Sequence, residues 1–242
     1  MKVKCAVPVL AAAAFFLFAG AAEAATGLKI PDDLATPRGA FYMIALFTAI
    51  TLAPSALVML TSFTRIVIVL SFVRNAVASP QIPPNTVIIG LALFLTVFTM
   101  APTWRDVQEN AVKPYLAGEI GEAEALSRVE EPLRNFMLTH TRKSTLSMFL
   151  EYTNKKPETP EETPMEVLVP AFAVSELRTA FEMGFMIYVP FLLIDLAVGT
   201  VLMSFGMIML PPVMVSLPLK IMVFVLADGW DTVVGALLAS YR

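Results

Sequence analysis

The strongest constraint on this sequence is an almost wholly apolar stretch near its carboxyl end, residues 183–226, which nevertheless contains Asp195 and Lys220. It is long enough for two bilayer-spanning helices of about 20 residues each. Each buried charge, and each proline that lacks an N–H, is costly in lipid. We therefore expect a hairpin of hydrophobic helices whose charges find partners in protein or water. Its expected helix breaks are the prolines Pro190, Pro211, Pro212 and Pro218.

The composition places the whole chain among integral membrane proteins. Hydrophobic residues make up 57% and the mean hydropathy is +0.73, whereas soluble domains are roughly 45 to 50% apolar. A net charge of −3 offers no basic face, which argues against a nucleic-acid partner. The sequence also lacks the G-x-x-x-x-G-K motif that cradles phosphates, and nothing in it calls for a cofactor.

The first 24 residues predict a cleavable signal peptide. Lys2 and Lys4 precede an apolar run, and the triplet 22–24 has alanine at both positions that a signal peptidase reads, so we expect cleavage between Ala24 and Ala25. The alternative is an uncleaved first membrane helix. Cys5, the only cysteine, lies in this segment, so a cleaved chain would have no disulfide and no cysteine metal site.

Residues 25–102 predict N-terminal hydrophobic helices. Apolar runs cover residues 41–60, 62–77 and 86–100, with prolines between the second and the third. Arg65 and Arg74 lie nine residues apart in the second run, on opposite sides of a helix, which does not suit a helix surrounded by lipid. Their positive charge favours a cytoplasmic side for this connection.

Residues 103–182 are different in composition, because acidic residues are frequent and outnumber basic ones. We expect a small polar helical domain on the outer, periplasmic side, followed by a polar linker at residues 157–166. His140, the only histidine, has no second ligand at metal spacing, so we expect it to be solvated and predict no metal site. The apolar face of the amphipathic helices is expected to contain Leu126, Val129, Leu133, Phe136 and Met137.

Methionines gather around the double proline of the carboxyl-terminal hairpin. Met203 and Met207 share a helix face, and Met209 lies beside Pro211. Thioether side chains are flexible and polarizable, so a cluster of them can seal around irregular shapes and then move aside. The alternative is that they are ordinary core or lipid-facing residues.

Two blocks of sequence resemble the FliP family of flagellar type III export-gate proteins, and the related injectisome subunits share both blocks. They are residues 62–77, SFTRIVIVLSFVRNAV, and residues 185–231, FMIYVPFLLIDLAVGTVLMSFGMIMLPPVMVSLPLKIMVFVLADGWD. The resemblance implies a homo-oligomeric ring that joins FliQ and FliR in a helical spiral at the bacterial inner membrane, in the flagellar basal body. Much of the nominally transmembrane chain would lie on the periplasmic side.

The same resemblance implies roles for particular residues. The family's methionine-rich constriction corresponds to Met207, Ile208 and Met209, where Ile208 departs from the usual third methionine. The charged residues of the hydrophobic segments would then lie in subunit contacts or near water, where ion pairs and hydrogen bonds offset their desolvation. These charged residues are Arg65, Arg74, Asp195, Lys220 and Asp228.

We therefore expect an all-α, membrane-associated protein whose residues 183–242 form the gate of a non-enzymatic conduit for unfolded flagellar subunits. Three alternatives stay open: an injectisome export gate, a small-solute or proton channel, and an intramembrane aspartyl protease using Asp195 and Asp228. The protease lacks support, because the G-x-G-D context of such enzymes is absent. The signal peptide and the long polar domain favour the flagellar branch.

Overall fold

The computed structural model describes residues 37–77, 83–153, 157, 159–207 and 209–242. Within these ranges every regular element is a helix, so the expected all-α class is confirmed. The expected signal peptide, with Ala24 and Ala25, lies outside the described residues, and so does Ile208 of the expected gate. The chain divides into two compact units, residues 1–53 and 54–242.

The described part of the first unit is the beginning of helix α2, Pro37–Leu60, which continues past the boundary into the second unit. Apolar residues dominate this helix, and its side chains Phe41, Ile44 and Phe47 are exposed. The Thr48 hydroxyl donates a hydrogen bond to the carbonyl of Ile44, which satisfies this polar side chain within the helix.

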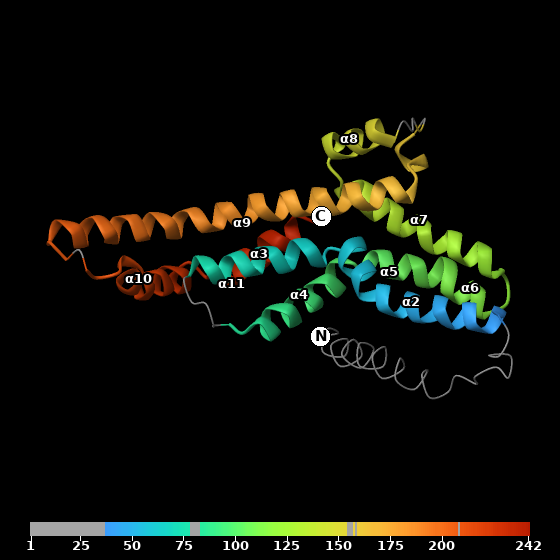
Figure 1. Ribbon diagram of the computed structural model, residues 1–242, viewed down its shortest axis with the longest axis horizontal. Coiled ribbons are helices and arrows are strands. Elements are labelled where there is room, and N and C mark those ends of the chain that lie inside the picture. Colours follow the sequence, from blue (N-terminus) through green and yellow to red (C-terminus); the bar gives the residue numbers. More distant parts are fainter. Residues whose placement is uncertain (1–36, 78–82, 154–156, 158, 208) are drawn as a thin grey trace, which may run out of the picture. The chain divides into compact units, whose positions relative to one another are not determined.

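The second unit contains the rest of the described chain. Its longer helices are α3 (Phe63–Ala76), α4 (Asn85–Thr99), α7 (Glu122–His140), α8 (Lys143–Thr153), α9 (Met165–Ser204), α10 (Pro212–Leu226) and α11 (Gly229–Ala239). Shorter elements are α5 (Ala101–Val107), the π-helix η2 (Gln108–Val112), α6 (Lys113–Leu116) and the 3₁₀ turn η3 (Pro160–Glu162). Within this unit α3 runs alongside α9, and α10 returns along the carboxyl-terminal part of α9 (Figure 1).

Two buried apolar clusters hold the second unit together. The first surrounds α3 and takes side chains from α4, α9, α10 and α11, with Ile66, Val69 and Leu70 at its centre. The second joins α7 to the start of α9 through Phe136, Met137 and other residues. Tyr241 packs against both clusters, so residues that follow α11 reach the junction between them.

A stripe along α9 explains why this helix lies so close to α3. Every fourth residue from Leu168 to Gly184 is buried, which places these residues on one side of the helix. The stripe consists of Leu168, Phe172, Glu176, Ala180 and Gly184. At its end, a β-carbon added to Gly184 would lie 2.5 Å from ring atoms of Phe72 on α3, so only glycine permits this close approach.

Gly184→Ala is expected to destabilise the protein by about 1 to 3 kcal/mol, because the methyl group would overlap a packed aromatic ring. The matched control is Gly90→Ala in α4, where a new β-carbon would meet nothing within 4 Å. This control should be neutral or stabilising, since alanine loses less backbone entropy in a helix than glycine. Thermal unfolding of the purified variants measures both, and equal midpoints would contradict the expected contact.

Two of the expected helix breaks are wrong. Helix α9 continues through Pro190, and α10 continues through Pro218. A proline removes one hydrogen bond and can bend a helix, but the remaining hydrogen bonds on either side let these two helices continue. The break expected at Pro211 and Pro212 is present, because α9 ends at Ser204 and Pro211 precedes the first residue of α10.

The same long helix crosses the domain boundary that composition suggested between residues 182 and 183, because α9 runs unbroken from Met165 to Ser204. Hydropathy changes there, but the backbone does not. By length and composition, α9 is the helix of the described ranges that could cross a membrane by itself. Two bent pairs could each add a span: α4 with α5–α6, bent by 56°, and α10 with α11, bent by 60°.

The polar region differs from expectation at two side chains. Leu126, placed on the apolar face by its spacing, is 71% exposed, because α7 meets its neighbours mainly through its later turns. His140 is half-buried rather than solvated: its Nδ1 bonds the carbonyl of Phe136 at 2.7 Å, and its ring contacts those of Phe136 and Tyr241.

Candidate functional site

The carboxyl-terminal hairpin turns at residues 205–211, which we call the hairpin tip. Helix α9 ends in a Schellman motif: Met207 N–H donates to the Leu202 carbonyl and Gly206 N–H to the Met203 carbonyl, each at 3.0 Å. Gly206 has φ 77°, a left-handed conformation that favours glycine. Pro211 and Pro212 then start α10 with a φ already suited to a helix. The end of α9 and the start of α10 on either side of the tip are therefore defined by hydrogen bonds and proline geometry.

The surface of the hairpin tip is apolar and largely uncovered by the described chain. Met209 is 97% exposed, and Met207 and Phe205 are also exposed. Together with Gly206 and Leu210, the two methionines line an open hollow. The structure thus brings together Met207 and Met209 of the expected gate. An exposed apolar patch of this kind is typical of a surface that meets another molecule.

Asp195 and Lys220 form an ion pair that joins the two helices of the hairpin. Lys220 Nζ lies 2.6 Å from Asp195 Oδ2, and the Ser216 hydroxyl donates to the other carboxylate oxygen. The side chain of Lys220 is 4% exposed and that of Asp195 22%. Nearer the tip, Gly199 faces the ring of Pro212 at contact distance. We call Asp195, Ser216 and Lys220 the clamp, because they fix α10 against α9.

Asp228 has a different place from the other expected buried charges. It is exposed and occupies the left-handed region, φ 45°, at the bend between α10 and α11. Its carbonyl accepts from Thr232 N–H at 3.0 Å, and no side-chain cap bond forms. The following Gly229 allows the Phe224 ring to pack directly over the backbone, since a β-carbon there would lie 2.2 Å from that ring. Asp228 therefore shapes an elbow and is no buried charge.

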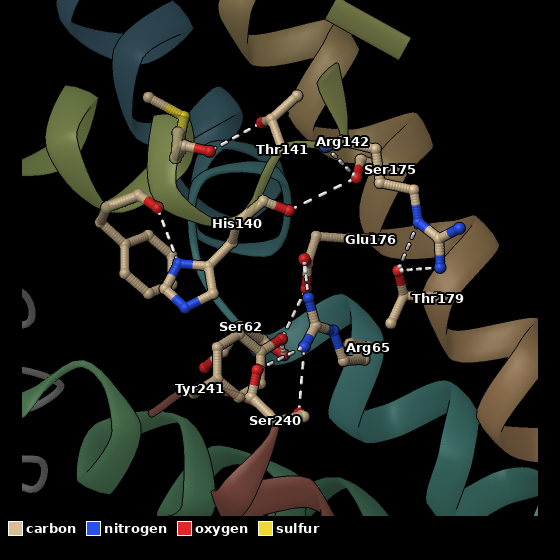
Figure 2. A network of polar contacts seen from close by, with 12 residues as sticks. Ser62, Arg65, His140, Thr141, Arg142, Ser175, Glu176, Thr179, Ser240 and Tyr241 are labelled. Carbon is tan, nitrogen blue, oxygen red and sulfur yellow. Dashed lines mark hydrogen bonds and ion pairs between the residues drawn. The ribbon is translucent and has the colours of Figure 1, made fainter. Parts of the chain in front are cut away.

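Arg65 of α3 lies in a buried polar network with residues of α9 and of the carboxyl end. It forms an ion pair with Glu176, and both are almost fully buried, at 3% and 0% exposure. The Tyr241 hydroxyl donates to the second oxygen of Glu176, and the Arg65 guanidinium lies 4.1 Å from the Tyr241 ring centroid. Figure 2 shows Arg65 between Glu176 on one side and Ser240 and Tyr241 on the other.

The electrostatics of this network keep the Tyr241 hydroxyl protonated. Burial first, and then the negative charge of Glu176, raise the pKa of Tyr241 well above its ordinary value. The neutral phenol can therefore act as a hydrogen-bond donor to the carboxylate at any physiological pH.

Arg74, the second arginine of α3, is less well satisfied. One of its guanidinium nitrogens donates to the side-chain oxygen of Asn85 at the start of α4. Its Nε is buried and has no hydrogen-bond partner among the described residues. From the sequence we expected these charges to find their partners in other subunits or in water. For Arg65, Arg74, Asp195 and Lys220 the structure supplies at least one partner from the same chain.

Sequence reasoning missed Glu176 and Tyr241, the partners of Arg65. A signal for Glu176 was present, because it interrupts a run of small and apolar residues at every fourth position of α9. A carboxylate on such a stripe predicts a cationic partner on the facing helix. No comparable signal marks Tyr241, which lies in a short polar end after α11.

The structure does not unite Asp195 and Asp228 as a protease dyad would require. Both oxygens of Asp195 are bound by Ser216 and Lys220, while Asp228 lies about two helical turns beyond Lys220. Among the described residues there is also no group of three potential metal ligands.

Comparison with known proteins gives the same family over most of the chain. Residues 46–237 match the FliP family. The flagellar biosynthetic protein FliP of Bacillus subtilis (strain 168) is 52% identical over 200 residues, covering 82% of this chain and 90% of the relative. That of Aquifex aeolicus (strain VF5) is 50% identical over 203 residues, covering 83% and 85%. That of Caulobacter vibrioides is 43% identical over 241 residues, covering 98% and 90%. With its sequence matched over this extent, the chain belongs to the FliP family.

Proposed function

We propose that this chain is a pore-forming subunit of the flagellar type III protein-export gate in the bacterial inner membrane. Several copies would form a ring with FliQ and FliR, through which unfolded flagellar subunits pass without any chemical step in this chain. The observation that carries the proposal is the hairpin tip, where Met207 is 46% and Met209 97% exposed. Tips from several copies, brought together around an axis, would make an apolar constriction.

Such a constriction suits the task physically. A narrow apolar passage excludes ions because it dewets, yet it can widen around a polypeptide. Methionine side chains adapt their shape at low energetic cost, which favours a seal that opens and closes around varied segments. The Schellman turn at Gly206 and the clamp behind it would hold each tip in place while only side chains move.

The test replaces Met207 and Met209 together with alanine. We expect a higher resting ion conductance of the assembled complex, because each change removes most of an apolar side chain from the constriction, while secretion continues or becomes less selective. The matched control is Met186→Ala, which changes another exposed methionine, on α9 away from the tip. Conductance in planar bilayers or in cells measures the seal, and an unchanged conductance of the double variant would count against it.

A small-solute or proton channel is the second candidate, because Asp195 retains partial exposure inside a hydrophobic hairpin. Purified protein that transports a solute without FliQ and FliR would favour this reading. Between flagellum and injectisome, the names of the relatives described above support the flagellar assignment.

A further inference from the structure

Ser240 and Tyr241, which follow α11, add hydrogen bonds to a buried ion pair whose two members lie on α3 and α9. Arg65 donates through Nη1 to the Ser240 hydroxyl at 3.0 Å and to the Ser240 carbonyl at 3.2 Å. Glu176 accepts from Arg65 at one oxygen and from Tyr241 at the other. A buried pair is stable only when its remaining hydrogen-bonding capacity is also satisfied. Here residues 240 and 241 supply three of the hydrogen bonds that the pair makes.

The pair has little hydrogen bonding to spare. Arg65 Nε is already buried without a partner among the described residues. If Tyr241 left, Glu176 Oε2 would lose the one side-chain donor that the described chain gives it, in a residue that is completely buried. Leaving this buried carboxylate oxygen without a donor costs free energy, which opposes any movement of residues 240 and 241 away from α3 and α9.

Residues 240 and 241 follow α11, at the end of the segment that begins at the hairpin tip with α10. From the tip, the chain passes through α10, the elbow at Asp228 and α11, which together we call the arm. The clamp fixes the arm to α9 near the tip. Beyond the elbow, α11 packs through Val233 and Leu237 into the cluster around α3.

We propose that Ser240 and Tyr241 form a latch that fastens the far end of the arm to the Arg65–Glu176 pair. The arm is then held at two points, by the clamp near the tip and by the latch beyond the elbow. Tyr241 is a positioning residue in this scheme, because it acts through the helix that precedes it.

The latch also ties the arm to the polar helices. The Tyr241 ring stacks on Phe136 of α7, with a centroid separation of 6.2 Å and an interplanar angle of 14°, and contacts His140 at 5.0 Å. A shift of the end of α7 would therefore displace the Tyr241 ring and, with it, the end of α11. The latch concerns how the chain holds its own arm, and it stands whichever solute the assembled protein passes.

Tyr241→Phe tests the latch with little disturbance, because the ring and its packing remain while the hydroxyl is lost. The measurement is amide hydrogen exchange of the full-length chain, purified in detergent with its bound partners. We expect the amides of α11 to exchange about tenfold faster, because the opened arm no longer breaks a hydrogen bond to a buried carboxylate. Peptides from α3 and from the first half of α9 should keep their protection.

The matched control is Tyr188→Phe, a half-buried tyrosine of α9 whose hydroxyl has no hydrogen-bond partner among the described residues. It should leave exchange in α11 unchanged. Ser240→Ala is a second, milder variant that removes one acceptor of Arg65 and should raise exchange in the same peptides by a smaller factor. Unchanged exchange of α11 in Tyr241→Phe would overturn the proposal. So would an equal loss of protection in α3, α9 and α11, since the hydroxyl would then support the whole fold.

Discussion

Arg65→Met is expected to cost about 3 to 5 kcal/mol, the largest single loss that the structure predicts. The methionine can occupy the space of the arginine stem, but Glu176 keeps a carboxylate with no exposure to solvent and loses the guanidinium that neutralises it. A membrane protein with such a defect should be recovered in low amount. The quantities to measure are the level of the chain in membranes and the thermal unfolding midpoint of what can be purified.

Two variants separate charge from packing at this site. Arg74→Met, on the same helix, removes a guanidinium whose partner is the neutral Asn85, so it should cost much less. The double change Arg65→Met with Glu176→Leu should recover part of the loss, because an apolar pair of similar volume leaves no unpaired charge. If the double variant were less stable than Arg65→Met alone, isolation of the Glu176 carboxylate would not be the cause of the defect.

Lys220→Met is the second large prediction, with an expected loss of about 2 to 3 kcal/mol. Asp195 would keep only the Ser216 hydroxyl, although its 22% exposure allows some contact with solvent and makes the cost smaller than at Glu176. Loss of the clamp should also free α10 from α9. We therefore expect both a lower unfolding midpoint and a less uniform resting conductance of the assembled complex.

Two controls test whether the unpaired Asp195 carboxylate causes the loss of stability in Lys220→Met. Adding Asp195→Asn to Lys220→Met should restore much of the midpoint, because the amide is neutral and can still accept from Ser216. Lys113→Met, at an exposed lysine of α6 without an ion pair among the described residues, should change stability by no more than about 0.5 kcal/mol. A clamp variant as mild as Lys113→Met would show that the ion pair between α9 and α10 contributes nothing.

Local patterns in the sequence predicted the helices well, because apolar periodicity and turn residues act over short distances. The run at residues 62–77 corresponds to α3, Phe63–Ala76, and the run at 86–100 to α4, Asn85–Thr99. Pro190 and Pro218 were misread because a proline removes only one hydrogen bond, and a long helix can lose one without ending. The boundary suggested at residue 183 marks a change in composition within one continuous helix, since composition reports the surroundings of a helix and not its continuity.

The partners of the charges were harder to predict, because they depend on contacts between distant parts of the chain. Arg65 and Glu176 are 111 positions apart, and Arg65 and Ser240 are 175 apart. Hydropathy shows that Lys220 and Asp195 are unusual, yet it does not show that they face each other across two helices. The sequence also did not predict that Asp228 is exposed, because this follows from its position at a bend with left-handed backbone conformation.

The continuity of α9 has a mechanical consequence. Its 40 residues extend for about 60 Å, twice the roughly 30 Å thickness of the hydrocarbon core of a bilayer. A straight α9 is therefore too long for such a core, and at least about half of it would lie outside the acyl chains. A few degrees of tilt imposed on the projecting half would swing the opposite end by several ångströms, so leverage alone could convey a disturbance outside the membrane to the turn that follows Ser204.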